Sequence, residues 1–324
     1  MKRAFITGIT GQDGSYLAEL LLAEGYHVTG LVRRTSAPAM ARLAHLIPNP
    51  DLVFIPGDMT DGESLRLALR DARPSEIYNL AAMSFVGASW AQPVLTFEVN
   101  TLGLVRLLDA VRAECPTARV YQASSSEQFG MVRETPQSES TPFNPRSPYG
   151  CSKAAAHYVA VNYRESYGLH VSCGILFNHE SERRGPEFVT RKIAMGVAAI
   201  TRGEADHLSL GNLDAGRDWG FAGDYVRAMY LMLQQDEPHD YVIATGTTHT
   251  VRDFCRLAFA AAGIGDWERH VRVDPAFIRP AEVPTLCGRA TRAMARLQWM
   301  PTLSFEGLVT TMVQAELAAP SRAA

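Results

Sequence analysis

Short apolar segments alternate with amphipathic ones through the first half of the chain, and this alternation limits the possible folds most strongly. Strands are expected at RAFITG, HVTGLV, DLVFIPGD, EIYNLAA, RVYQASS and HVSCGILFNH. Helices are expected between them, at SYLAELLLAEG, at DGESLRLALRDA with Asp61 as N-cap, within Pro93–Glu114, and from about Pro148 to Gly168. Buried strands that alternate with helices form a parallel sheet covered on both faces. The sequence therefore predicts an α/β fold with a doubly wound parallel sheet.

The alternation becomes less regular beyond Asn178. Helices are expected near residues 188–202, 222–235, 250–262 and 304–318, with the short strands HLSL, DYVIATG and HVRVDP among them. This pattern favours a smaller second layer that is discontinuous in sequence and returns to the main sheet.

Glycines follow the first expected strand at a regular spacing, Gly8-x-x-Gly11-x-x-Gly14. Tight turns in general use glycine, but a turn between the first strand and helix of a βαβ unit favours a dinucleotide site. There the backbone can approach a pyrophosphate at the helix N-terminus. The predicted cofactor turn is Gly8, Thr10, Gly11, Gln12, Asp13 and Gly14.

Two arginines stand where a site for NAD usually has an acidic residue, at the end of the second strand. Arg33 and Arg34 could hold a 2′-phosphate, which favours NADP, although a solvated basic loop is the alternative. The end of the third strand, Asp58 and Met59, is expected near the adenine. The segment after the fourth strand is expected to line the path to the nicotinamide, through Leu80, Ala81, Ala82 and Ser84.

A tyrosine and a lysine lie four residues apart at the start of an expected helix. Tyr149 and Lys153 therefore share a helix face. A neighbouring ammonium and the positive ring of an oxidised nicotinamide would favour the phenolate and lower the tyrosine pKa. Ser125, after the fifth strand, would add a hydroxyl. The alternative reading is an ordinary pair on a helix surface.

Composition excludes several function classes. The net charge is −3, which does not favour nucleic acid or an anionic membrane as partner. The chain opens on a strand rather than a leader, and no apolar run reaches the ~20 residues that span a bilayer. The five scattered cysteines favour reduced thiols in a cytoplasmic protein, and the nine histidines show no metal spacing. We therefore expect no metal.

At this point the chain resembles the extended short-chain dehydrogenase/reductase family, and within it the GDP-mannose 4,6-dehydratases. The resembling segments run from residue 4 to about 300. They are GITGQDGSYLAELLL, YNLAA, YQASSSE, TPFNPRSPYG, NYRESYG, GILFNHES-RRG-EFVTRKI, LGNLDAGRDWG and RPAEV. Departures lie in AAMSFVGASW, around Met83, and in Ala154–His157, where they could change the pocket and its choice of substrate.

The resemblance implies a Rossmann domain for NADP over residues 1–178, with returns near 218–248. A GDP-sugar domain would comprise 179–217 and 249–324. The implied reaction oxidises C4 of GDP-mannose, removes water across C5 and C6, and returns the hydride to C6. The implied product is GDP-4-keto-6-deoxy-D-mannose.

Site residues follow from the same resemblance. The resemblance implies that the catalytic residues are Ser125, Glu127, Tyr149 and Lys153. It also implies that His179 and Arg184 bind the cofactor. The substrate contacts are expected to be Ser84, Ser125, Glu127, Asn178, Val189, Lys192, Gly211, Arg217, Arg279 and Glu282. The segment Arg33–Arg42 resembles a loop that reaches a neighbouring subunit's cofactor, which implies a homodimer or homotetramer.

Glu127, two residues past Ser125, is interpreted as the base that removes the C5 proton, and a capping or salt-bridged carboxylate is the alternative. Other functions also stay open. A GDP-4-keto-6-deoxy-mannose reductase would consume NADPH in stoichiometric amounts, and another nucleotide-sugar dehydratase or epimerase would share the fold. A silent NADP-sensing regulator is the non-enzymatic alternative, against which the intact Tyr149, Lys153 and Glu127 argue.

Overall fold

The computed structural model describes residues 1–36, 40–277 and 281–320. Its centre is a seven-stranded sheet with the order β11-β6-β5-β4-β1-β2-β3, in which every neighbouring pair is parallel. The strands are β1 Arg3–Thr7, β2 His27–Val32, β3 Leu52–Pro56, β4 Glu76–Asn79, β5 Arg119–Ser125, β6 Val171–Leu176 and β11 Tyr241–Ile243. The order reverses between β1 and β4, and such a reversal opens a crevice at the carboxyl edge. The predicted doubly wound parallel sheet is confirmed.

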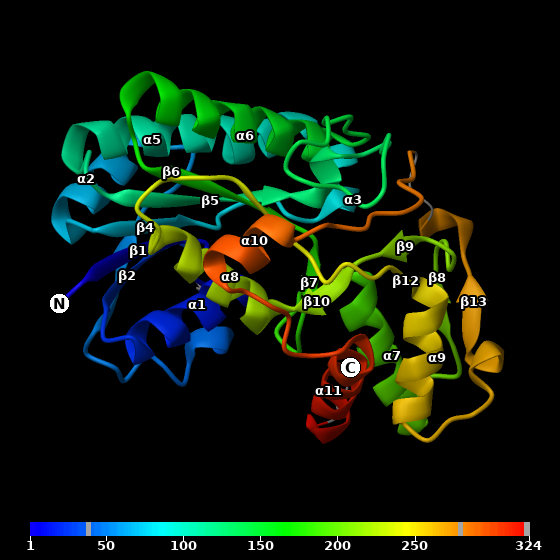
Figure 1. Cartoon of the computed structure of the whole chain (residues 1–324). Coiled ribbons are helices and arrows are strands. Elements are labelled where there is room, and N and C mark those ends of the chain that lie inside the picture. Colours follow the sequence, from blue (N-terminus) through cyan, green and yellow to red (C-terminus); the bar gives the residue numbers. More distant parts are fainter. Residues whose placement is uncertain (37–39, 278–280, 321–324) are drawn as a thin grey trace.

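Helices cover both faces of this sheet (Figure 1). Successive strand residues point to opposite faces, so Ile77 packs in one hydrophobic cluster and Tyr78 in the other. One face carries α1 Gln12–Ala23, α8 Ala222–Leu233 and α10 Thr291–Leu297. The opposite face carries α2 Gly62–Ala72, α5 Gly103–Glu114 and α6 Pro148–Tyr167.

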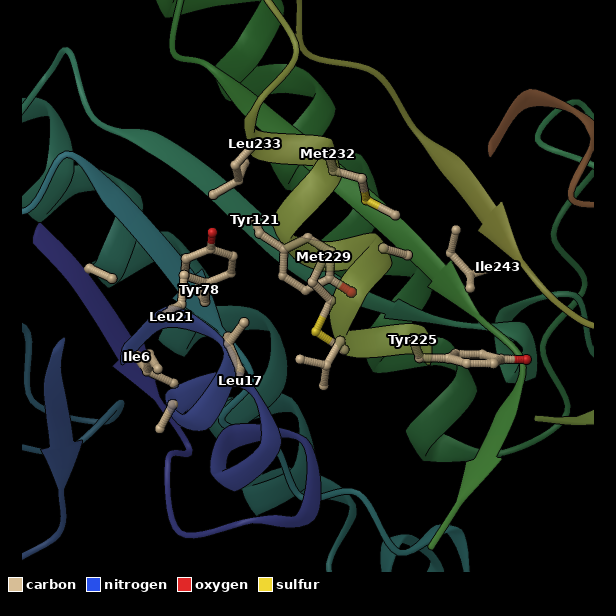
Figure 2. Packing of buried hydrophobic residues seen from close by; sticks show 14 of the residues in the cluster. Ile6, Leu17, Leu21, Tyr78, Tyr121, Tyr225, Met229, Met232, Leu233 and Ile243 are labelled. Carbon is tan, nitrogen blue, oxygen red and sulfur yellow. The ribbon is translucent and has the colours of Figure 1, made fainter. Parts of the chain in front are cut away.

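The first cluster joins segments far apart in the sequence (Figure 2). Leu17 and Leu21 of α1 pack with Met229 and Met232 of α8 against the buried ring of Tyr121. Helix α8 is thus held on the sheet by the first helix of the chain. Helix α2, on the opposite face of the sheet, begins where the sequence predicted. Its N-cap is Asp61, whose side chain accepts from the N–H groups of Glu63 and Ser64.

The helix expected within Pro93–Glu114 is divided into three parts, α4 Pro93–Phe97, a π-helical turn η2 Glu98–Leu102, and α5. Gly103 is the first residue of α5 and packs closely on Met59. A Cβ added at Gly103 would lie 3.0 Å from the Met59 Cβ. The other short helices are α3 Val86–Ala91, η1 Ala41–Leu43, η3 Ser126–Gln128, η4 Trp267–His270 and η5 Pro275–Phe277.

A separate hydrophobic cluster lies beside the carboxyl edge of the sheet. It is built by α7 Val189–Thr201, α9 Val251–Ala261 and α11 Phe305–Ala318. Three two-stranded sheets accompany it, namely β7 Asn178–Glu180 with β10 Trp219–Phe221, β8 Leu208–Leu210 with β13 Val271–Val273, and β9 Gly216–Arg217 with β12 His249–Thr250. Between these segments the chain returns to the main sheet as α8, β11 and α10. The exact domain limits stay a prediction.

Within the described ranges, no helix combines the length and apolarity that crossing a bilayer requires. All five cysteines are unpaired.

Candidate active site

A cavity of about 770 Å³ opens where β4, β5 and β6 end. The four predicted catalytic residues all line it. So do the predicted substrate residues Ser84, Asn178, Val189, Lys192, Gly211, Arg217 and Glu282. Arg279, also predicted here, lies outside the described residues. One cavity therefore brings together residues that span two hundred positions of sequence.

Two adjacent segments, the end of β5 and the start of α6, hold the four predicted catalytic residues. The Ser125 Oγ accepts from the Glu127 N–H at 3.3 Å, which starts η3 and fixes the buried Glu127 beside it. Helix α6 is capped by the Ser147 Oγ, which accepts from the Gly150 N–H at 3.0 Å. This cap places Tyr149 in the first turn, facing the end of β5.

The Tyr149 phenol is buried and hydrogen-bonded to Ser125. Burial raises its pKa to about 12, although the Ser125 hydrogen bond acts in the opposite direction. In the protein alone desolvation is the largest influence on this pKa, so the lowering expected from the lysine together with an oxidised nicotinamide stays a prediction for the complex. At neutral pH the protein holds Tyr149 as a neutral phenol.

Lys153 lies one helical turn from Tyr149, with its Nζ 5.9 Å from the centroid of the Tyr149 ring. Its ammonium donates to the Ala123 carbonyl at 2.9 Å, so β5 fixes the side chain. Burial lowers the Lys153 pKa to about 8. The predicted pairing on one helix face is present, but the ammonium touches the strand rather than the phenol oxygen.

The glycine turn between β1 and α1 has no room for side chains. Gly8 has φ +69°, and an added Cβ would lie 2.8 Å from the Ala81 nitrogen. At Gly14 an added Cβ would lie 2.4 Å from the Gly8 carbonyl oxygen and 2.5 Å from the Ile9 Cα. These clashes are with backbone atoms, so a side chain at either position would force the turn itself to shift. The turn is therefore a cradle of the kind that dinucleotide pyrophosphates occupy.

Gly14→Ala is accordingly expected to weaken cofactor binding by at least about tenfold, because the added methyl displaces the turn. Titration of NADP against protein fluorescence measures this. Gly265→Ala is the control, since nothing lies within 4 Å of a Cβ added there. Equal affinities in both variants would contradict a pyrophosphate site at this turn.

An ion pair fastens the same turn to β7. His179 donates through Nε2 to Asp13 Oδ2 at 2.8 Å and through Nδ1 to the Phe177 carbonyl at 2.8 Å. Burial alone would lower the His179 pKa, but Asp13 raises it overall. Gln12 joins this contact by donating to Asp13 Oδ1 and to the His179 carbonyl. Because both ring nitrogens face oxygen acceptors, this contact favours the charged form of His179 and ties the glycine turn to β7.

A second cavity, of about 400 Å³, lies beyond the ends of β2 and β3. Arg33 and Arg34 line it together with Asp58, Asp61 and Ser64. The two arginines and Asp58, predicted separately from sequence, thus share one hollow near the glycine turn.

Other predicted cofactor residues take different places. Leu80, Ala82, Ser84 and Arg184 line the large cavity, whereas the Met59 side chain is in the core. The Thr10 carbonyl accepts from Arg42, and the Ala81 N–H donates to the Thr7 hydroxyl. Residues 37–39 of the predicted intersubunit loop lie outside the described residues, and Arg42 itself contacts its own chain's turn.

The end of the cavity remote from Tyr149 combines cations with aromatic and backbone surfaces. The Lys192 ammonium lies 3.5 Å from the centroid of the Phe277 ring. An added Cβ at Gly211 would lie 2.6 Å from the Phe277 carbonyl oxygen, so the backbone is closely approached there. Arg217 Nη1 donates to the Val283 and Gly216 carbonyls, each at 2.8 Å. This end suits an anionic, aromatic ligand.

Aromatic side chains on the cavity wall were not predicted from sequence. Phe85 packs edge-to-face on Phe188 at 5.7 Å, and the Arg184 guanidinium lies 3.6 Å from the centroid of the Phe188 ring. Trp90 lines the same wall. Phe85 and Phe188 stand directly before the helices α3 and α7, and aromatic residues at such helix starts were the available signal. Among the described residues, no group of acidic, histidine or cysteine side chains could hold a metal.

Comparison with known proteins places this geometry in context. A model of the family described as GDP-mannose 4,6 dehydratase matches residues 5–312. GDP-mannose 4,6 dehydratase 1 of Arabidopsis thaliana is 50% identical over 326 residues, covering 98% of this chain and 90% of that protein. The Homo sapiens GDP-mannose 4,6 dehydratase is 48% identical, covering 97% of this chain and 91% of that protein. The structure of DesIV, a dTDP-glucose 4,6-dehydratase from Streptomyces venezuelae with NAD and TYD bound, superposes with a TM-score of 0.87 at 28% identity, covering 97% of this chain and 96% of that one.

Proposed function

The chain belongs to the GDP-mannose 4,6-dehydratase family, and from this premise we propose that it uses NADP and the residues Ser125, Glu127, Tyr149 and Lys153 for the family reaction. It is an enzyme, a nucleotide-sugar 4,6-dehydratase that converts GDP-mannose to GDP-4-keto-6-deoxy-D-mannose. The observation that carries the residue assignment is their convergence in one cavity with Lys192, Arg217 and Glu282. The glycine cradle and the paired arginines fit a phosphorylated dinucleotide.

Oxidation at C4 needs a group that takes the hydroxyl proton. Tyr149 is within hydrogen-bonding reach of Ser125, so the two hydroxyls can share the sugar O4 between them. An oxidised nicotinamide, when bound, would supply the hydride chemistry between C4 and C6 and a positive charge in the site. Because the protein alone keeps Tyr149 neutral, this added charge and Lys153 are needed before the phenol can act as a base.

Elimination of water needs a second base at a different carbon. A ketone at C4 acidifies the C5 proton, and Glu127 lies in the same cavity, two residues from Ser125. We assign to Glu127 the removal of the C5 proton and its delivery to the departing C6 hydroxyl. The phenol and the carboxylate thus handle protons at different atoms of one sugar.

The function is tested by incubating the protein with GDP-mannose and a trace of NADP. Formation of a 4-keto-6-deoxy product in amounts far above the cofactor is expected, because the hydride is returned in every turnover. Product analysis by mass spectrometry and NMR measures it. Turnover that instead requires stoichiometric NADPH and a 4-keto substrate would identify a reductase and overturn the proposal.

The choice of NADP rests on the second cavity. Arg33 and Arg34 line this cavity just after β2, and we assign the cofactor ribose to it because a guanidinium can bind a 2′-phosphate through two parallel hydrogen bonds. Asp58 in the same cavity is assigned to the adenosine. Directly after β2 the chain has Arg33 and Arg34 rather than an acidic residue, which would repel the 2′-phosphate.

Arg34→Asp is expected to weaken NADP binding by about tenfold or more and NAD binding by much less, because the aspartate repels the 2′-phosphate. Isothermal titration calorimetry with both dinucleotides measures the two dissociation constants. Arg269→Asp is the matched control, an exposed arginine remote from the cavity. An Arg34→Asp protein with unchanged preference for NADP would refute the assignment.

Self-association and a cytoplasmic location complete the proposal. Apolar side chains stand exposed along α4, η2 and α6, among them Val94 at 79%, Leu102 at 45% and Tyr158 at 62% exposure. Such a surface supports a homodimer or homotetramer, which light scattering would identify. The five unpaired cysteines support a reducing compartment.

A further inference from the structure

Asp218 is a completely buried carboxylate that does not line the cavity but lies between two residues that do, Arg217 and Trp219. Its Oδ1 accepts from the Thr245 N–H at 2.8 Å and from the Thr245 hydroxyl at 2.7 Å. Its Oδ2 accepts from the N–H groups of Gly246 at 2.9 Å and Gly288 at 3.2 Å. A buried carboxylate with four donors is held in a single orientation.

These four hydrogen bonds join three segments that are distant in sequence. Asp218 stands between β9 and β10, Thr245 and Gly246 follow β11, and Gly288 belongs to the segment 281–288. The backbone at Gly288 packs closely on its neighbours, since a Cβ added there would lie 2.3 Å from the Ala244 Cβ. Asp218 therefore fixes the segment 281–288 against β9 at one end.

Backbone hydrogen bonds continue this attachment toward the cavity. The Gly216 N–H donates to the Pro284 carbonyl at 2.9 Å, and the Leu286 N–H donates to the Gly216 carbonyl at 3.3 Å. Arg217 Nη1 then donates to the Val283 carbonyl at 2.8 Å. The guanidinium of Arg217 and the adjoining Glu282 are thus placed on the cavity wall by the same attached segment.

We propose that Asp218 is a positioning residue for the nucleotide end of the cavity, which holds Arg217 and the segment 281–288 in the geometry that binds the GDP part of the substrate. The inference rests on the proposed function, since it takes that end of the cavity to bind GDP. Asp218 does not touch the ligand. Its loss should therefore weaken GDP binding while leaving the dinucleotide site intact.

An isosteric change removes half of this support. In Asp218→Asn, the amide oxygen can still accept from Thr245, but the amide nitrogen faces the N–H groups of Gly246 and Gly288 and cannot accept from them. The segment 281–288 then loses its attachment at Gly288. Thr245→Val is a milder change that removes only the hydroxyl donor.

The chain offers a matched control for both variants. Asp224, which is also buried, accepts from the Thr302 N–H and the Thr302 hydroxyl, each at 2.8 Å. Neither Asp224 nor Thr302 lines the cavity. Asp224→Asn and Thr302→Val therefore remove hydrogen bonds of the same kind without touching the nucleotide end, although Asp224→Asn also weakens a 3.7 Å ion pair with Arg227.

The experiment measures the dissociation constants of GDP and NADP by calorimetry and the melting temperature of all five proteins. Asp218→Asn is expected to raise the GDP dissociation constant by about tenfold or more, and Thr245→Val by about threefold. The NADP constant should stay within about twofold in every variant, and both controls should bind GDP as the wild type does, although they melt lower.

Four results would overturn the inference. GDP binding by Asp218→Asn equal to wild type, or equal losses in the Asp218 and Asp224 variants, would make Asp218 a stability residue only. If Asp218→Asn fails to fold, Thr245→Val decides, and GDP binding equal to that of Thr302→Val refutes the proposal. A wild-type protein that binds NADP but no GDP would instead refute the proposed function, and with it this inference.

Discussion

Tyr149→Phe is expected to lower kcat with GDP-mannose by about 10³-fold, within the ~10²–10⁴-fold range of general acid–base catalysis. The change removes one oxygen from a buried ring and leaves the Ser147 cap and the packing of α6 in place. Ser125 loses the phenol as a hydrogen-bond partner, and the O4 proton has no acceptor. Steady-state product formation and the NADP dissociation constant should be measured together, since only the first is expected to change.

Tyr158→Phe is the control for this variant, because Tyr158 lies on the same helix and is 62% exposed. It should turn over at the wild-type rate. If Tyr149→Phe were also to retain that rate, another group would have to take the C4 proton, and the assignment of the tyrosine would be lost.

Glu127→Gln is expected to separate the two halves of the reaction and to lower product formation by about 10²–10⁴-fold. Glutamine has the size of glutamate, and Tyr149, Lys153 and the nucleotide end are unchanged. Oxidation at C4 should proceed while elimination stops, so reduced nicotinamide accumulates in a single turnover. Stopped-flow absorbance detects the reduced cofactor, and mass spectrometry detects the missing 6-deoxy product.

Solvent deuterium gives the second measurement for this residue. In D₂O the wild type should place deuterium at C5 of the product, because the proton removed there leaves with the departing hydroxyl as water and C5 takes up a new proton from solvent when hydride adds at C6. Glu165→Gln, an exposed change on α6, should behave as the wild type. Native product formation with deuterium at C5 in Glu127→Gln would show that the carboxylate is only structural.

The sheet and the cofactor turn could be predicted because their signals are local. The apolar runs from RAFITG to RVYQASS each form a strand, and Gly8 and Gly14 take positions that exclude a side chain. The spacing of Tyr149 and Lys153 likewise fixes a shared helix face wherever the helix lies. Resemblance to the family then extended this reading to Glu127 and Arg217, which line the same cavity.

What the sequence could not supply depends on tertiary contacts. The motif RDWG reads equally well as a surface turn, and only its burial between β9, β11 and the segment 281–288 makes Asp218 a centre of hydrogen bonding. The spacing of Tyr149 and Lys153 also does not reveal how deeply the phenol is buried, and in the protein alone this burial raises the Tyr149 pKa. Helix α10 was missed because TRAMARL is short and lacks a capping side chain.

The late position of β11 in the chain has a consequence for synthesis on the ribosome. Six strands of the sheet are complete once Leu176 has been made, but the seventh, Tyr241–Ile243, emerges more than sixty residues later. Until then β6 is an unprotected edge strand with apolar side chains, a template for wrong pairing with another nascent chain. We expect this interval to be when the growing polypeptide depends most on chaperones, and slow translation across it to increase aggregation.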